Sequence, residues 1–461
     1  METEMNQAID KRTSGTGWST KALGACLMVV AALMAACLMM AAQPAHASTT
    51  LTVNSTADFH DTITNDGFCG FGGSCSFRSA IEEANSNPGA DTINFDIPGT
   101  GVKTIVVNAT GLGALPAIKE QVTINGYTQT DAHPNTKAVG NDAALKIQLD
   151  GTNVGGNALE ISNASGSVIK GLVINRFGLA GIFVNGDSVA NRIEGNFIGT
   201  DPTGTIDRGN GQDAVTIFAG PSQTVVGGTT RAARNLLSGN GNRGVAILDS
   251  DSSCIQGNYV GTDKSGTKDL GNAHAGVLLF GGSDNLVGNG TSAGSNSIAF
   301  NGDDGITVSG STTSGNVISR NSVFSNVGLG IDLVGGVEDA AGRTANDAGD
   351  VDAGPNGLQN KPSLGSAKTV SGKTTVKGTL NSAAGKTYRV EFYSNPSGDE
   401  GKKFIGAKVV STGSDGKAAF TFTPATKVSV GRTVTATATN TTTGSPRDTS
   451  EFSAPRRVTS T

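Results

Sequence analysis

One pattern recurs along the middle of the chain and restricts the folds that this sequence can adopt. Between residues 177 and 334, an Asn that is usually followed by Gly precedes two variable residues, a Gly or Ala, and a short β-branched segment. The repeated asparagines lie 30, 32, 29 and 25 residues apart, and they are Asn210, Asn240, Asn272, Asn301 and Asn326. A period of this length indicates that each repeat is one structural unit stacked on the next.

The repeat predicts a parallel β-helix over residues 91–334. Each repeat holds short strands that close on Gly-Asn or a related pair, as at Gly195-Asn196 and Gly257-Asn258. Coils of such a solenoid stack about 4.8 Å apart, so equivalent residues become neighbours. Val215 and Ile217 alternate with outward residues at period two, as equivalent apolar pairs do in the other repeats. We therefore expect the five repeated asparagines to form an internal amide ladder.

The composition agrees with an all-β chain and excludes several classes of protein. Gly accounts for 66 of the 461 residues, and charged side chains account for 16%. Gly is costly inside helices and favours turns, and so few charges argue against a disordered polyelectrolyte. The 34 Lys and Arg residues against 39 Asp and Glu residues give a net charge of −5. Because such a chain has no overall positive field, no nucleic-acid partner is expected.

Residues 1–47 are typical of a signal peptide. Basic residues precede an apolar run from Ala22 to Ala42, and Ala45-His46-Ala47 follows as a cleavage site. An uncleaved anchor and a lipoprotein attachment at Cys37 are the alternatives. No other stretch is apolar and long enough to span a membrane, so the mature protein is expected to be secreted or held in a bacterial cell envelope without a membrane span.

Residues 48–90 are predicted to form a capping region for the open end of the solenoid. Cys69 and Cys75 lie close in sequence and are expected to form a disulfide in an oxidising compartment. Ser76 is a suitable N-cap for a short helix. The apolar positions on one face of this helix are Phe77, Ala80, Ile81 and Ala84.

The segment Cys75-Ser76-Phe77-Arg78-Ser79-Ala80-Ile81, with Asp66-Gly67 before it and Ala84-Asn85 after it, resembles the CSLREA motif of bacterial surface proteins with right-handed parallel β-helix repeats. Phe77 and Ser79 stand where that family usually has Leu and Glu, so a salt bridge made by that Glu is absent here. The resemblance extends over nearly the whole mature chain. It implies export and a pectate-lyase-like architecture, and it implies little about activity.

After residue 361 the pattern changes to alternating strands of hairpin length. With Asp415-Gly416 as a turn signal, residues 362–461 are predicted to form an Ig-like or fibronectin-like β-sandwich. Residues 335–361 are expected to be a solvated acidic linker. The alternative for this linker is a calcium site at Asp347, Asp350 and Asp352, although Gly354 stands where an EF-type loop needs an oxygen ligand. No cofactor other than calcium is expected.

The variable positions of the repeats supply candidate catalytic residues. His274 and Asp303 are expected on adjacent coils about 5 Å apart. Asp213 and Arg243 form a second adjacent pair, and Asp304 lies two coils from Arg243. Such groups can provide the acid and base of a glycoside-cleaving site. Turns on the surface of a solenoid are also polar simply because they are solvated, and we favour that interpretation.

The sequence therefore favours an exported, non-catalytic β-helix surface protein that acts in adhesion or binds extracellular matrix or polysaccharide. Its partner would be a polysaccharide or a cell-surface protein. Phe183 and Leu278, in the outward row of the repeats, predict a mildly apolar ridge that suits such an extended partner. The alternative is a polysaccharide lyase or glycoside hydrolase acting in a groove over the middle coils.

Overall fold

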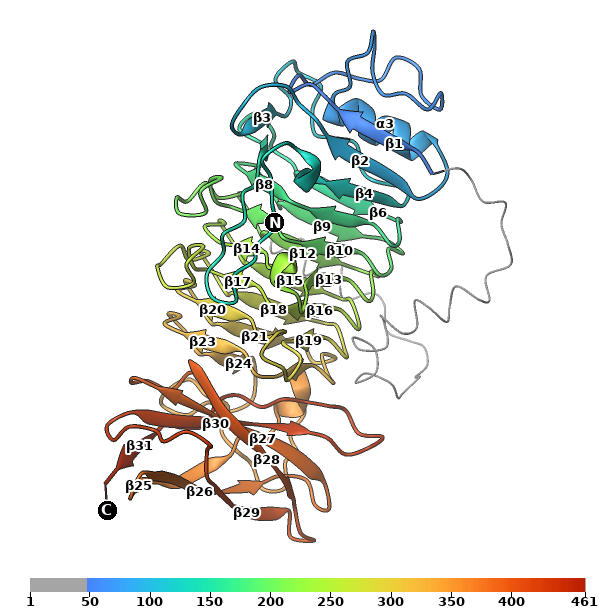
Figure 1. The fold of residues 1–461 in the computed structure, drawn as a ribbon. Helices are drawn as coiled ribbons and strands as arrows, with labels where there is room; N and C mark the ends of the chain where they lie inside the picture. The colour runs from blue at the N-terminus through green and yellow to red at the C-terminus, as the bar shows by residue number, and fades with distance from the viewer. Residues whose placement is uncertain (1–47, 461) are drawn as a thin grey trace.

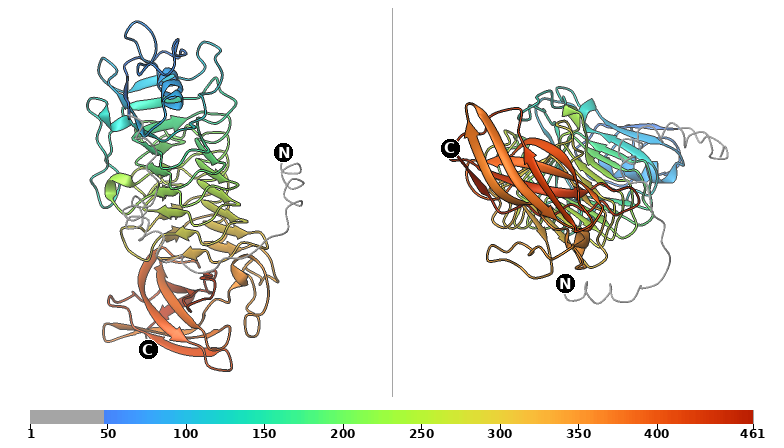
Figure 2. Two further views of the ribbon diagram at one scale, coloured as in Figure 1. Left: turned by 90° about the vertical axis from the view of Figure 1, so that its right-hand side faces the viewer. Right: turned by 90° about the horizontal axis from the view of Figure 1, so that it is seen from below.

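Residues 48–460 are described by a computed structural model, in which stacked coils form a column with a further β-structure at its C-terminal end (Figure 1). The signal peptide expected over residues 1–47 lies outside the described residues. Seen from a second side, the blue N-terminal end and the red C-terminal end lie at opposite ends of the column (Figure 2). Within residues 48–460, no helix is long and apolar enough to cross a membrane.

Three parallel sheets run along the column of the described chain. The first sheet contains, in order, β1 (Thr50–Val53), β2 (Asp91–Phe95), β4 (Val122–Asn125), β7 (Val168–Lys170), β10 (Arg192–Glu194), β13 (Val225–Gly227), β16 (Cys254–Gln256), β19 (Leu286–Val287) and β22 (Val317–Ile318). The second contains β3 (Lys103–Val106), β5 (Ile147–Asp150), β8 (Leu172–Asn175), β11 (Phe197–Ile198), β14 (Leu236–Leu237), β17 (Tyr259–Val260), β20 (Ser297–Ala299) and β23 (Ser322–Phe324). The third contains β6 (Leu159–Ser162), β9 (Ile182–Asn185), β12 (Val215–Phe218), β15 (Val245–Leu248), β18 (Val277–Phe280), β21 (Ile306–Ser309) and β24 (Ile331–Leu333).

Apolar side chains at equivalent positions of successive coils stack along the inside of the column. In the third sheet, one inward row pairs directly in register from coil to coil and is at most 2% exposed: Ile182, Val215, Val245, Val277, Ile306 and Ile331. The burial of each apolar side chain against its equivalent in the next coil is the main stabilising force in a solenoid, because each coil contacts only its neighbours. The predicted parallel β-helix is confirmed.

Buried asparagines line the corners between the sheets. At the corner between the second and third sheets, each amide nitrogen donates to the amide oxygen of the next coil, over 2.9–3.0 Å, along Asn210, Asn240, Asn272, Asn301 and Asn326. A second such row joins Asn196, Asn235, Asn258, Asn296 and Asn321. At the third corner, the amide oxygens of Asn285, Asn316 and Asn356 accept from the backbone of the preceding coil. These amides satisfy turn backbone that water cannot reach.

Helix α3 (Phe77–Ser86) lies at the N-terminal end of the column, against β1 and β2. Its apolar face is at most 3% exposed and belongs to the core that continues into the solenoid: Phe77, Ala80, Ile81 and Ala84. Ser76 and Ser79 form a capping box at its start. Strand β1 lies inside the expected capping region and pairs with β2 as the end strand of the first sheet.

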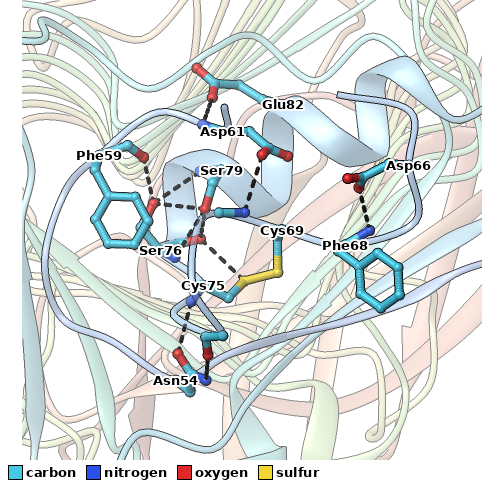
Figure 3. Close-up of a disulfide and its surroundings, with 12 residues drawn as sticks. Asn54, Phe59, Asp61, Asp66, Phe68, Cys69, Cys75, Ser76, Ser79 and Glu82 are labelled. Atoms are coloured by element: carbon cyan, nitrogen blue, oxygen red, sulfur yellow. Dashed lines mark hydrogen bonds between the residues drawn. A yellow bond between two sulfur atoms is a disulfide. The ribbon is translucent and has the colours of Figure 1, made fainter. Parts of the chain in front are cut away.

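The loop before α3 is held by a disulfide and by a buried ion pair. Cys69 and Cys75 are bonded, with their Cα atoms 5.0 Å apart (Figure 3). Arg78 on α3 donates from Nε to Asp58 Oδ1 at 2.7 Å and from Nη2 to Asp58 Oδ2 at 2.9 Å. Both side chains are at most 2% exposed. The charges are thus removed from water together and in bidentate geometry.

The C-terminal strands form a largely antiparallel structure around their own core. Their order is β28 (Lys403–Ser411), β27 (Thr387–Asn395), β30 (Thr433–Asn440), β31 (Arg456–Thr459), β25 (Ser363–Val370), β26 (Lys373–Asn381) and β29 (Lys417–Phe422). Strand β31 joins the two halves, pairing with β30 on one side and with β25 on the other. Phe392 stacks on Phe422 in the core between them, with ring centroids 4.1 Å apart.

This C-terminal region continues the bonding pattern of the solenoid past its last coil. Glu400 accepts from the amide of Asn326, the last member of the first asparagine row, at 2.9 Å. The side chain of Phe452 packs against Gly330. Within the expected linker, the short 3-10 helix η3 (Pro355–Leu358) contributes Asn356 to the third corner and Leu358 to the apolar core. The expectation of a solvated linker is therefore corrected for residues 355–361, which are packed.

Candidate functional site

The candidate catalytic residues lie at the corner that leads into the third sheet. His274 and Asp303 are both exposed, and within the described residues no hydrogen bond or ion pair joins them. Arg243 Nη1 lies 3.9 Å from Asp213 Oδ1. The structure thus brings Asp213 and Arg243 together, and His274 is near enough to Asp213 to oppose electrostatically the rise that burial causes in the pKa of its carboxyl. Within residues 48–460, no side-chain hydrogen bond or ion pair joins Asp303 or Asp304 to Asp213 or Arg243.

Asp213 and Asp304 hold the backbone of the next coil. Asp213 Oδ1 accepts from the backbone N–H of Arg243 at 3.0 Å, and its Oδ2 accepts from Thr216 at 2.9 Å. Asp304 repeats this arrangement with the N–H of Leu329 at 2.7 Å and with Thr307 at 2.9 Å. Burial raises the pKa of both carboxyls, and these hydrogen bonds oppose the rise. Both residues therefore have a structural use that needs no substrate.

A further carboxyl stands beside Asp304. Asp332 follows Thr307 in the outward row of the third sheet. Burial, followed by the charges of Asp304, Glu451 and Glu338, raises the pKa of Asp332 to about 7. A cluster of acidic groups therefore lies on the last coils, and the pKa of one of them is near neutral pH.

Asp347, Asp350 and Asp352, the candidate calcium ligands, do come together. Carboxylate oxygens from the three residues lie within 4.8 Å of one another, and each residue is partly buried. Burial raises the pKa of Asp350 to about 6, although hydrogen bonds from Ser382 and Asn360 oppose that rise. Hard oxygen ligands of this kind suit Ca²⁺.

The structure also contains a cleft that the sequence did not indicate. It has a volume of about 550 Å³, and its floor is the outer face of the second sheet. Tyr259 of β17, Ser297 of β20 and Ser322 of β23 are in direct register along this floor. The successive coils therefore arrange these side chains in a line about 4.8 Å apart.

The walls of the cleft come from loops of the solenoid and from the C-terminal region. A loop after the short 3-10 helix η1 (Gly126–Thr128), drawn in teal, runs along the second sheet (Figure 1). It covers the apolar outward residues Phe197 and Leu236 and ends beside Tyr259, whose hydroxyl accepts from the N–H of Gly140 at 2.8 Å. In the coils after Tyr259, the outward position of the second sheet is occupied by serine and no longer by an apolar residue. The loop does not cover these coils, so the floor of the cleft is open.

Among residues 48–460, the cleft is lined by cations and by no carboxylate. Arg234, which follows the 3-10 helix η2 (Arg231–Ala233), comes from the solenoid, and Lys402, Lys403 and Arg432 come from the C-terminal region. We name this feature the basic cleft. Its remaining lining residues are Ala138, Val139, Tyr259, Ser265, Gly266, Thr267, Ser292, Ser295, Asn296, Ser297, Phe300, Ser322, Phe324 and Ser325. None of the five candidate catalytic residues is among them.

Aromatic rings hold two of these cations in place. The guanidinium of Arg234 lies 4.6 Å from the ring centroid of Tyr259, and Lys402 Nζ lies 4.0 Å from that of Phe324. Phe324 meets Phe300 edge to face, with centroids 5.7 Å apart. Such contacts favour a cation over a ring face and keep the ammonium group at the cleft.

The outward ridge expected on the third sheet is wider than the sequence indicated. Phe183 and Leu278 occupy the outward row as expected. A second row places Phe218, Leu248 and Phe280 in register on three successive coils, and Phe183 stacks on Phe218 with centroids 6.1 Å apart. Each member of this second row lies two residues after the first outward position of its strand. The period-two alternation of strand side chains was therefore the sequence signal that could have found it.

No protein-family model matches the sequence, and no curated protein matches it. Among solved structures, tailspike protein 2 of an Escherichia coli O157:H7 bacteriophage is similar at 10% identity over 85% of this chain, with a TM-score of 0.26; the chain spans 62% of the tailspike's length. A Geobacillus virus E2 protein is similar at 11% identity, with 91% of this chain and 84% of that chain covered and a TM-score of 0.23. The A-module of an Azotobacter vinelandii mannuronan C-5 epimerase is similar at 15% identity, with 62% and 98% covered and a TM-score of 0.20.

Proposed function

We propose that this protein is an exported, non-catalytic surface protein that binds extracellular polysaccharide in the basic cleft. The observation that carries the proposal is the lining of that cleft, in which the described residues supply serine hydroxyls, aromatic rings and cations but no carboxylate. Hydroxyls and amphipathic rings suit a sugar polymer. Hydrolysis of a glycoside ordinarily needs a pair of carboxyl groups flanking the bond. The cleft is thus equipped to hold a polysaccharide and not to hydrolyse it.

We also infer that both ends of the solenoid are closed by dedicated structures. Residues 48–90 would be the N-terminal cap, and residues 362–461 would be an Ig-like or fibronectin-like sandwich that covers the other end. The apolar face of α3 in the common core supports the first assignment. The contacts of Glu400 and Phe452 with the last coils support the second. An open end would otherwise expose apolar side chains and unpaired backbone.

Membership of the CSLREA-motif surface proteins and a place outside the cytoplasm belong to the same proposal. They are supported by the segment Cys75–Ile81 and by the bond between Cys69 and Cys75, because disulfides persist in oxidising compartments.

The test is incubation of the protein with a panel of neutral and acidic polysaccharides, with binding, new reducing ends and unsaturated products measured on the same samples. We expect binding with no new ends. Release of shortened or unsaturated products, lost in a His274→Ala, Asp303→Ala double variant, would establish the enzyme alternative. Absence of binding to every member of the panel would refute the proposed function.

A further inference from the structure

The geometry points to a polyanion as the ligand of the basic cleft: a linear acidic polysaccharide, bearing carboxylate or sulfate groups, held jointly by the solenoid and the C-terminal region. This inference rests on the proposed function and specifies the class of polysaccharide. Two observations support it: the positive charge of the cleft, and the alignment of polar side chains along its floor.

No ion pair within the described residues neutralises the charges of the cleft. In the described part of the chain, Arg234, Lys402, Lys403 and Arg432 form no ion pair, whereas Arg78 and Arg343 are paired with carboxylates. Arg234 donates to backbone carbonyls, including Gly140 O at 2.6 Å, and these hold its side chain without cancelling its charge.

The carboxylate nearest to Lys402 in sequence bonds to the solenoid and does not line the cleft. Glu400 lies two residues before Lys402, and its oxygens accept from Asn326 Nδ2 and from the N–H groups of Ser325 and Asn326. It is not part of the lining. Cations that face the same space without a counter-charge repel one another, so an anion that enters the cleft relieves this repulsion.

The floor favours an extended, hydroxyl-bearing polymer. Tyr259, Ser297 and Ser322 follow one line across three coils, with Lys402 and Lys403 beyond its C-terminal end. The cleft is a groove on the side of a solenoid, a surface that such folds use for extended partners.

The same cations and rings also suit a single-stranded nucleic acid. The net charge of −5 argues against it, because nucleic-acid binding depends on a broad basic surface. DNA is therefore one arm of the test.

The experiment compares the full chain with a Lys402→Glu, Lys403→Glu variant. The control is Lys373→Glu, Lys377→Glu, which makes the same charge change at exposed positions of β26 in the same region. Binding of polygalacturonate, dextran sulfate, neutral dextran and single-stranded DNA is measured by titration calorimetry at about 50 and about 300 mM salt.

We expect the parent and the control to bind polygalacturonate or dextran sulfate, with affinity that falls as salt rises. The cleft variant should bind at least about tenfold more weakly. The two acidic probes distinguish carboxylate from sulfate recognition. Binding of dextran as tight as that of the acidic probes would overturn this inference and leave the proposed function standing. Equal affinity in the cleft and control variants would overturn both, because the proposed function places the polysaccharide in the basic cleft. Tighter binding of DNA would overturn both, as would binding of none of the probes.

Discussion

Replacement of Asn272 by Ala tests whether the first asparagine row stabilises the solenoid. The Asn272 side chain is 1% exposed and makes four hydrogen bonds. Its Nδ2 donates to Leu237 O at 3.0 Å and to Asn301 Oδ1 at 2.9 Å. Its Oδ1 accepts from the amide of Asn240 at 3.0 Å and from the backbone N–H of Asn240 at 3.1 Å.

The expected cost follows from what the substitution leaves behind. The buried N–H of Asn240 loses its acceptor, which costs about 1–3 kcal/mol, and the three other lost bonds cost about 0.5–1 kcal/mol each. The total, about 2.5–6 kcal/mol, is a large share of the roughly 5–15 kcal/mol by which folded proteins are typically stable.

The measurement is urea unfolding followed by circular dichroism, with Asn242→Ala as the matched control. Asn242 belongs to the same turn as Asn240, and its amide donates to the exposed Gln212 at 3.2 Å. Its loss should change the free energy of unfolding by no more than about 0.5 kcal/mol. If Asn272→Ala shifts the urea midpoint no more than Asn242→Ala does, the first asparagine row does not stabilise the coils.

Three further predictions concern the ends of the solenoid. The pKa of Asp332 is about 7 in the folded protein and lies near 3.9 in an unfolded chain; the folded state therefore holds an extra proton between these values, and stability falls as pH rises through about 7. Asp332→Asn should raise the melting temperature at pH 8 more than at pH 5, and an equal change at both would contradict this. Arg78→Leu leaves the carboxylate of Asp58 buried without its partner and should cost about 3–5 kcal/mol in thermal unfolding, whereas a loss below about 1 kcal/mol would show that Asp58 is neutral or hydrated. Millimolar Ca²⁺ should raise the melting temperature of the parent and not of Asp350→Asn, and the calcium assignment fails if neither protein responds.

The repeating part of the fold was predictable because, in a parallel solenoid, residues that lie one repeat apart in the sequence contact each other in adjacent coils. Asn210 and Asn240 are neighbours in the structure for the same reason that they recur in the sequence. The second asparagine row was signalled by the Gly-Asn pairs at Asn196 and Asn258, and the structure shows that these also bond from coil to coil.

The basic cleft was not predictable, because its parts do not repeat. Tyr259 belongs to a coil, Val139 to a loop inserted many coils earlier, and Lys402 to the hairpin of another region. The loop reaches Tyr259 through the bond from Gly140, and Lys402 joins them because the C-terminal region docks on the last coil, where Val323 pairs with Gly401. Periodicity carries no information about that contact. Asp213 is the opposite case, since its place in a polar turn is equally typical of a catalytic acid and of a residue that binds the next turn.

We propose that this solenoid holds an acidic polysaccharide without cleaving it, and one measurement tests both parts of the proposal. Size-exclusion chromatography with light scattering, on a mixture of the protein and polygalacturonate of defined length, measures both parts at once. We expect protein and polymer to elute together at low salt, and we expect the polymer recovered at high salt to have its original mass. Separate elution at low salt, or recovery of a shortened polymer, would contradict it.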